Sequence, residues 1–178
     1  MSIEVLPRSA WDTSSDTRRF SRPLLPERVR GVVLHWPGVP NLSIIGEERA
    51  AVARRLRNFR DYHRRVRGWP DIGYLLAVDQ AGRIWDLAGP VVGAHSATGR
   101  YPLANHEQVG VVVMVGLDEV PSHACRTAIA WLRQIIRRGS LGLTLPAWPD
   151  YPGATALAGH RQMPGADTAC PGPYVLHI

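Results

Sequence analysis

The feature that most constrains the fold of this chain is the alternation of short apolar runs with long amphipathic segments. Residues Gly31 to Trp36 form a β-branched apolar run that ends at a Pro-Gly pair, which is typical of a buried strand leading into a turn. Residues Val109 to Gly116 are apolar enough for a central strand, and residues Ala154 to Gly159 predict one more short strand. These runs indicate a sheet assembled from separate parts of the chain.

Two segments between these runs have the pattern of helices. From Glu47 to Arg67 there is neither Gly nor Pro, and apolar residues recur at steps of three and four. Gly68 is expected to end this helix. Ser122 is expected to cap a second helix from about His123 to Arg138. The pattern therefore places two helices against the predicted sheet.

The order of these elements predicts the fold class. Residues 71–79 and 83–87 flank a Gly-containing turn and predict a hairpin. The order strand, helix, hairpin, strand, helix, strand predicts an α/β or α+β domain with a central mixed β-sheet flanked by helices. A chain of 178 residues is long enough to bury one core, so we expect a single domain over residues 1–178. Within it, we expect an irregular arm at residues 1–30 and a surface connection at residues 139–153.

The positive charge of the chain comes entirely from arginine. There are 21 basic residues, all of them Arg, against 15 acidic ones, which gives a formal net charge of +6. Eight arginines crowd the non-apolar face of the first predicted helix: Arg49, Arg54, Arg55, Arg57, Arg60, Arg64, Arg65 and Arg67. This face is either a solvated surface that reflects codon bias or a surface that attracts anionic wall polymers or lipid headgroups. We expect no nucleic-acid binding, because no base-stacking aromatic set or helix-turn-helix pattern accompanies the charge.

The beginning of the sequence bears on where the protein is made. The segment Met1 to Trp11 lacks the pattern of a secretory signal, because Glu4 and Pro7 stand where a basic start and an apolar run are required. The longest strongly apolar stretch, Val109 to Leu117, is far shorter than the roughly 20 residues that span a bilayer. We therefore expect the protein to be made in a cytoplasm. In that compartment Cys125 is expected to be a small buried residue rather than part of a disulfide.

Three side chains that bind zinc well stand at the ends of predicted strands or just beyond them. His35 ends one strand-like run, His160 follows another, and Cys170 precedes a Pro-Gly pair. Two imidazoles and a thiolate suit a tetrahedral zinc whose fourth position is left to water, which is the plan of a catalytic site. The spacing alone leaves open a second interpretation, in which these histidines are ordinary surface or core residues. Most single histidines in a chain with seven are of that kind.

Short sequence motifs in a fixed order make a family recognisable. In chain order they are Pro7–Trp11, Gly31–His35, Asp71–Tyr74, Gly93–His95, Asn105 with Val109–Val111, Gly159–Arg161 and Thr168–Gly172. Over residues 6–173 the sequence resembles the bacteriophage lysozyme-type amidases and the peptidoglycan recognition proteins. The resemblance implies that residues 1–178 form one zinc amidase catalytic domain with the fold of that superfamily.

The resemblance also implies an activity. It is that of an N-acetylmuramoyl-L-alanine amidase, a zinc hydrolase that cuts the amide between the lactyl group of N-acetylmuramic acid and the first L-alanine of the peptide stem. His35, His160 and Cys170 are then the ligands of the Zn²⁺ cofactor. Zinc polarises the scissile carbonyl and lowers the pKa of its bound water to roughly 7. The thiol of Cys170 must lose its proton to bind the metal.

Four more residues match positions to which the superfamily gives a role. Tyr74 is expected to steady the attacking water or the developing oxyanion, with a half-buried strand aromatic as the alternative. Thr168 stands where some phage members carry lysine and where the amidase-active recognition proteins carry threonine, so it is expected to donate one hydrogen bond to the oxyanion. His95 and Asn105 match groove positions and are expected to contact the substrate. For His95, structural hydrogen bonding is an equal alternative.

These expectations favour a zinc-dependent peptidoglycan amidase of the phage endolysin kind, which causes host lysis. Such an enzyme is made in the cytoplasm of the host bacterium and acts on the cell wall after release. We expect a monomer whose partner is bacterial peptidoglycan. A non-catalytic peptidoglycan-binding module is the alternative, because superfamily members that lose the metal ligands bind without cutting. A glycosidase is not favoured, since no pair of carboxylates stands out in the sequence.

Overall fold

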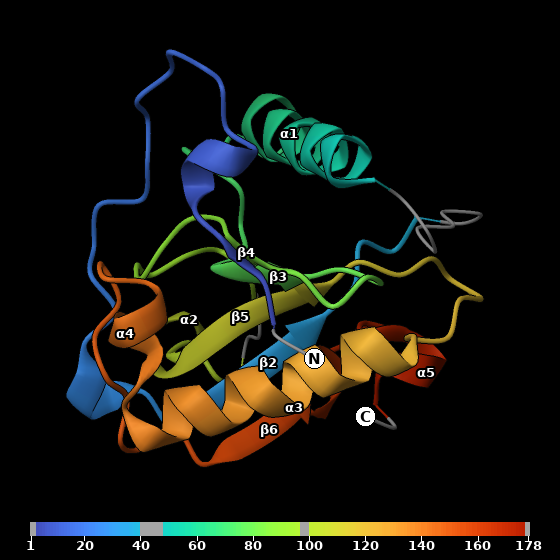
Figure 1. The fold of residues 1–178 in the computed structure, drawn as a ribbon. Coiled ribbons are helices and arrows are strands. Elements are labelled where there is room, and N and C mark those ends of the chain that lie inside the picture. The colour runs from blue at the N-terminus through green and yellow to red at the C-terminus, as the bar shows by residue number, and fades with distance from the viewer. Residues whose placement is uncertain (1–2, 40–47, 97–99, 177–178) are drawn as a thin grey trace.

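The computed structural model of the chain describes residues 3–39, 48–96 and 100–176. They form a mixed six-stranded sheet in the order β1-β4-β3-β5-β2-β6, with helices on both faces (Figure 1). The strands are β1 Val5–Leu6, β2 Gly31–His35, β3 Leu76–Val78, β4 Ile84–Asp86, β5 Gln108–Val113 and β6 Ala156–Gly159. The α-helices are α1 Arg49–Arg65, α2 Ala104–Glu107, α3 His123–Arg138, α4 Leu141–Thr144 and α5 Gly172–Val175, and 3-10 helices span Arg8–Ala10, Pro26–Arg28 and His160–Gln162. The predicted α/β fold with a central mixed sheet is confirmed.

Strand β2 lies inside the sheet between two parallel neighbours. β5 pairs with it on one side and β6 on the other. All five residues of β2 are buried, as is typical of a parallel strand covered on both faces. The predicted hairpin is present as antiparallel β3 and β4, with shorter strands than expected. Its turn requires Gly82, whose φ is +80° and where a Cβ would lie 2.8 Å from the carbonyl oxygen of Ala124.

The two predicted long helices are confirmed, with small changes of boundary. α1 lies inside the predicted range 47–67, whose first residue falls outside the described residues, and Gly68 follows the helix with a φ of +70°. α3 has its predicted bounds, and the hydroxyl oxygen of Ser122 accepts a hydrogen bond from the backbone amide of Cys125. Within the described ranges, no helix has both the length and the apolar character needed to cross a bilayer.

The two long helices cover opposite faces of the sheet (Figure 1). On one face, Val52 and Leu56 of α1 belong to the same buried cluster as Val112 of β5. On the other face, Ile129 of α3 belongs to a second cluster with Val111 of β5. Successive side chains of a strand point to opposite faces, so β5 contributes to both layers of the core.

The prediction that residues 1–30 form an irregular arm is wrong in part. Val5 and Leu6 form β1, which pairs in parallel with β4 at the edge of the sheet. Trp11 is fully buried, and its indole N–H donates a hydrogen bond to the carbonyl oxygen of Asp86 over 2.7 Å. Two residues are too few to show the period of a strand in the sequence. β1 is a strand only because it pairs with β4, and the sequence pattern does not reveal that pairing.

The prediction of a surface connection at residues 139–153 is also wrong. This segment forms α4 and buries four large side chains in the cluster that holds α3, namely Leu141, Leu145, Trp148 and Tyr151. The Gly and Pro residues of the segment favour a loop. Its large apolar side chains nevertheless draw it onto the core, because their burial is favourable whatever the local backbone shape.

Arg60 of α1 helps to hold the N-terminal arm against the domain. Arg60 donates to the carboxylate of Asp12. The same carboxylate accepts from Arg8 at 2.9 Å and from Arg19 at 3.0 Å, and its side chain is only 3% exposed. Burial by itself would raise the pKa of Asp12, but hydrogen bonds led by that from Arg60 lower it, so the carboxylate stays charged. We call Asp12 with these three arginines the arginine clamp.

Further arginines of α1 reach the same arm. The contacts are Arg49 with Glu4, Arg57 with the carbonyl oxygen of Trp11, and Arg64 with Asp16. The arginine-rich face predicted from the sequence therefore has a structural role that the pattern did not reveal. Attraction to anionic polymers or lipids stays a prediction, and it concerns the exposed arginines Arg54, Arg65 and Arg67.

Asp12→Ala should lower the free energy of unfolding by about 2 kcal/mol, because it leaves the buried guanidinium of Arg60 and the partly buried ones of Arg8 and Arg19 without their shared carboxylate. Urea denaturation monitored by circular dichroism measures this change. The matched control is Arg18→Gln, which breaks a solvent-exposed ion pair with Asp16 and should leave the stability almost unchanged. Equal effects of the two substitutions would contradict the clamp.

Candidate metal centre and adjacent pocket

Three potential metal ligands meet where two parallel strands end. His35 is the last residue of β2, and His160 directly follows β6. These strands pair in parallel with Leu34 opposite Gly159, so their carboxyl ends lie side by side and deliver both histidines to one place. Cys170 reaches the same place from the loop before α5. One ligand atom from each of the three residues lies within 4.8 Å of the other two.

The geometry of this group suits a metal ion. The Sγ of Cys170 is 3.6 Å from the Nδ1 of His35, and the rings of His35 and His160 lie with their centroids 4.8 Å apart. His35 is buried, whereas His160 and Cys170 are only partly buried, so the group has one side toward solvent. Two nitrogens and one sulfur match the ligands of zinc and leave one tetrahedral position open. The structure thus brings together the three side chains that the sequence singled out.

The protonation states of the three side chains fit metal binding. Burial, together with neighbouring His95 and His160, lowers the pKa of His35 well below its usual range, and burial also lowers the pKa of His160. Both rings are therefore neutral at pH 7 and offer a nitrogen lone pair. Burial raises the pKa of the Cys170 thiol to about 11. The thiol keeps its proton until a metal displaces it.

Tyr74 stands between the metal centre and a pocket. Its ring centroid is 5.4 Å from that of His35 and 5.5 Å from that of His63. Burial, and then the nearby Cys170 thiol, raise the pKa of the Tyr74 phenol above its usual range. The phenol therefore stays protonated at neutral pH and can donate a hydrogen bond.

The pocket beside Tyr74 has a volume of about 500 Å³ and largely aromatic walls. Its lining residues are Pro37, Gly38, Val39, Phe59, Tyr62, His63, Arg67, Trp69 and Tyr74. The guanidinium of Arg67 lies 5.8 Å from the ring centroid of Tyr62 and gives one wall a positive charge. An apolar chain that carries a carboxylate matches such a lining.

Thr168 lies two residues before Cys170 and shapes the loop that carries it. Its hydroxyl oxygen accepts a hydrogen bond from the backbone amide of Cys170 over 3.1 Å. A hydroxyl that accepts one bond can still donate its own proton. The hydrogen bond gives Thr168 a structural role, and the predicted donation to an oxyanion stays a prediction.

The two predicted substrate contacts, His95 and Asn105, make internal hydrogen bonds. His95 is 5% exposed, and its Nδ1 lies 3.1 Å from the Nε2 of His35. Its Nε2 lies 3.2 Å from the carbonyl oxygen of Gln108. The amide of Asn105 accepts from the backbone N–H of Ser96 at 2.9 Å and donates to the carbonyl of Ser96 at 2.7 Å. A contact of either residue with a substrate stays a prediction.

Known proteins resemble this chain in sequence, although no family model matches it. The peptidoglycan-recognition protein LB of Drosophila melanogaster is 33% identical over 138 residues, which are 70% of this chain and 52% of that protein. The N-acetylmuramoyl-L-alanine amidase of Sus scrofa is 33% identical over 135 residues, which are 72% of this chain and 19% of that protein. The chain thus spans about half of the first relative and about a fifth of the second.

Solved structures share the whole fold. Drosophila PGRP-LB matches with a TM-score of 0.75 and 25% identity, over 99% of this chain and 92% of that one. The chain belongs to the superfamily of peptidoglycan recognition proteins and N-acetylmuramoyl-L-alanine amidases. A second member, recognition protein LE in complex with tracheal cytotoxin, a monomeric diaminopimelic acid-type peptidoglycan, matches with a TM-score of 0.66 and 25% identity, over 94% of this chain and 87% of that one.

The sequence pattern does not predict most of the aromatic pocket beside Tyr74. The spacing of apolar residues at steps of three and four predicts that Phe59 and Tyr62 lie on the apolar face of α1, yet Tyr62 is 48% exposed. Trp69, just beyond the helix, was not singled out at all. The available signal is the bunching of aromatic residues at the end of α1 and after it, next to the arginine at position 67. A core face alone would carry more aliphatic side chains.

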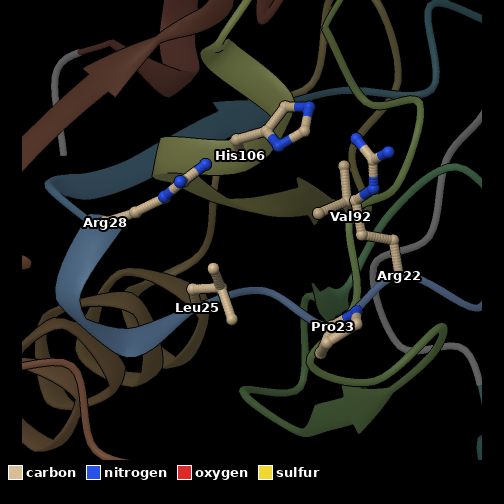
Figure 2. Close-up of a pocket in the computed structure, with 6 residues that line it drawn as sticks. All are labelled: Arg22, Pro23, Leu25, Arg28, Val92 and His106. Carbon is tan, nitrogen blue, oxygen red and sulfur yellow. The ribbon is translucent and has the colours of Figure 1, made fainter.

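A second pocket of the chain, of about 360 Å³, lies near the starts of β2 and β5 (Figure 2). It is lined by Arg22, Pro23, Leu25, Arg28, Val92 and His106. Arg28 precedes β2 and His106 precedes β5, so the pocket is at the opposite end of β2 from His35. Its lining holds neither a carboxylate nor a thiol nor a hydroxyl. The metal centre is therefore the better candidate for hydrolytic chemistry.

The metal-free protein should lose stability between pH 6.5 and pH 4, and His63 should contribute to this loss. Burial, and then the charge of Arg67, lower the pKa of His63 to about 4, and its Nδ1 accepts a hydrogen bond from the amide of Gly73 at 3.1 Å. The unfolded chain, with a histidine pKa of about 6.5, takes up the proton first as the pH falls. Unfolding therefore becomes easier as the pH drops through this window.

His63→Asn retains a hydrogen-bond acceptor near Nδ1 but removes the titration of this residue, so it should reduce the fall in unfolding free energy between pH 6.5 and 4. The part of the fall that comes from His35, His95 and His160, whose pKa values are also lowered, should remain. Urea denaturation at several pH values measures the slope. His123→Asn at an exposed position of α3 is the control and should leave the slope as in the wild type. A slope that is unchanged in His63→Asn would refute this assignment.

Proposed function

We propose that this chain is a zinc-dependent N-acetylmuramoyl-L-alanine amidase that acts on bacterial peptidoglycan. The observation that carries the proposal is the convergence of His35, His160 and Cys170 on one point beside Tyr74. Membership of a superfamily that includes named amidases supports the reaction type. The pocket next to Tyr74 supports a substrate that enters from that side.

The donor set fits zinc, the metal of amidases in the superfamily. His35 and His160 would each hold it through a ring nitrogen and Cys170 through its thiolate. When bound, zinc supplies Lewis-acid chemistry that polarises a carbonyl and acidifies water. Because His160 and Cys170 are only partly buried, the side of the site that faces solvent would receive the substrate amide.

The residues around the metal centre would bind the substrate and stabilise the transition state. The aromatic pocket would take the peptide stem, and Arg67 would pair with one of its carboxylates. The protonated phenol of Tyr74 would donate a hydrogen bond to the amide oxygen as negative charge develops there. Recognition protein LE, a structural relative, is known in complex with a monomeric diaminopimelic acid-type peptidoglycan, which supports this class of ligand.

A peptidoglycan-binding module without catalysis is the second candidate. It is favoured by the names of the relatives, many of which are recognition proteins rather than amidases. Against it stands the presence of all three metal donors in a neutral or ionisable state suited to zinc. A module that only binds has no need of this set.

We further propose the biological setting of a phage endolysin. The protein would be made in the cytoplasm of the host bacterium, reach the cell wall after release and lyse the host as a monomer. Residues 1–178 would form one catalytic domain, and the exposed arginines of α1 would favour anionic wall polymers. The support is the sequence resemblance together with the arginine-rich, lysine-free composition.

The zinc-loaded protein should release stem peptides that begin with L-alanine from purified diaminopimelate-type peptidoglycan, with no new reducing sugar ends. Mass spectrometry of the soluble products measures this. Cys170→Ala should lose both zinc and cleavage, because two imidazoles alone hold zinc weakly. Tyr74→Phe should keep zinc and lose at least about tenfold in turnover, since it removes one donor to the developing oxyanion.

The controls separate the two candidate functions. Circular dichroism must show that both variants are folded. If wild-type protein sediments with the wall but releases nothing, the binding module is correct and the amidase is refuted. Full turnover in Cys170→Ala would refute the metal assignment, and full turnover in Tyr74→Phe would leave Tyr74 with a structural role only.

A further inference from the structure

The two ring nitrogens of His35 face different partners. Nδ1 faces the Sγ of Cys170 at 3.6 Å, on the side of the metal centre. Nε2 faces the Nδ1 of His95 at 3.1 Å, on the side of the protein interior. A metal needs a ring nitrogen without a proton, so a neutral His35 that binds metal through Nδ1 must carry its proton on Nε2.

A backbone carbonyl sets the direction of the hydrogen bonds. The Nε2 of His95 lies 3.2 Å from the carbonyl oxygen of Gln108, the first residue of β5. A carbonyl oxygen only accepts, so the Nε2 of a neutral His95 carries the proton and its Nδ1 is free to accept. The Nδ1 of His95 then accepts the proton that Nε2 of His35 donates. The chain of bonds leaves the lone pair of His35 Nδ1 pointing at the metal centre.

The ring of His95 is itself held on two sides. A Cβ at Gly110 would lie 2.4 Å from the Cγ of His95, so only glycine at this position of β5 lets the ring lie against the strand. Asn105 holds the next residue, Ser96, by bonding to both its backbone N–H and its carbonyl. Two of the sequence motifs that mark the resemblance, the one that ends at His95 and the one that joins Asn105 to Gly110, therefore serve one arrangement.

We infer that His95 is a positioning residue, which fixes the tautomer and orientation of His35 so that Nδ1 of His35 faces the metal. This inference rests on the proposed zinc function. It differs from the substrate contact expected for His95, because both ring nitrogens are already engaged and the residue is almost fully buried. Residues that orient a metal-binding histidine in this way typically change metal affinity 10- to 100-fold when they are replaced.

Two substitutions of His95 separate its two hydrogen bonds. In His95→Asn the side-chain oxygen takes the place of Nδ1 and still accepts from His35, but the bond to Gln108 is lost. In His95→Gln the side-chain amide reaches the place of Nε2 and still donates to Gln108, but no acceptor faces His35. If His95 acts through His35, only His95→Gln should weaken zinc binding.

Zinc affinity, measured by competition with a chromogenic chelator, should fall about 10- to 100-fold in His95→Gln and by less than about threefold in His95→Asn. The visible spectrum of the cobalt-substituted protein should match the wild type in His95→Asn and differ in His95→Gln. The same pair of substitutions at exposed His123 should change neither measurement. Equal zinc affinity in all variants, or an equal loss in both His95 variants, would overturn the inference.

A metal-free measurement separates this inference from the proposed function. Nitrogen-15 NMR of the histidine rings in the wild-type protein without zinc should show His35 with its proton on Nε2, and His95→Gln should lose this single tautomer. A proton on Nδ1 of His35 in the wild type would overturn the inference. A wild-type chain with this tautomer that binds no zinc would instead refute the proposed function.

Discussion

The parallel pairing of β2 with β5 on one side and β6 on the other is the constraint on which the rest of the structure depends. It places His35 and the residue after Gly159 at the same edge of the sheet, and it aligns β5 so that Gly110 lies opposite Val33. Two histidines from distant parts of the chain thereby meet without any loop having to position them. Parallel strands must be covered on both faces, which is why α1 and α3 lie on opposite sides (Figure 1).

Charge has two separate uses in this molecule. Between α1 and the N-terminal arm, arginines bind carboxylates of the arm, and Asp12 is the buried centre of the arginine clamp. Near the metal centre, burial instead keeps the titratable groups neutral: His35 and His95 lose basicity and the thiol of Cys170 loses acidity. Under the proposed zinc function, a neutral and partly open site of this kind would gain charge only with the metal, so metal binding and deprotonation of the thiol would be coupled.

Sequence periodicity is sufficient to predict the elements that bury a continuous face, such as α1, α3 and β5. Local sequence motifs are sufficient to predict that His35, His160 and Cys170 lie together. Prediction from periodicity fails where tertiary contacts decide the structure. β1 exists because β4 offers it an edge, and residues 139–153 fold inward because their large side chains find a core. The orientation of His95 could not be predicted from the sequence either. It depends on a backbone carbonyl of β5 and on the absence of a Cβ at Gly110, and a pattern of side-chain types reveals neither.

X-ray absorption at the zinc edge of the zinc-loaded wild-type protein tests the central claim most directly, namely that the ends of β2 and β6 and the loop before α5 build one metal site. The account predicts one zinc per chain with one sulfur at about 2.3 Å and two imidazole nitrogens at about 2.0 to 2.1 Å. A first shell of nitrogen and oxygen without sulfur, or zinc that is lost on dialysis, would contradict it.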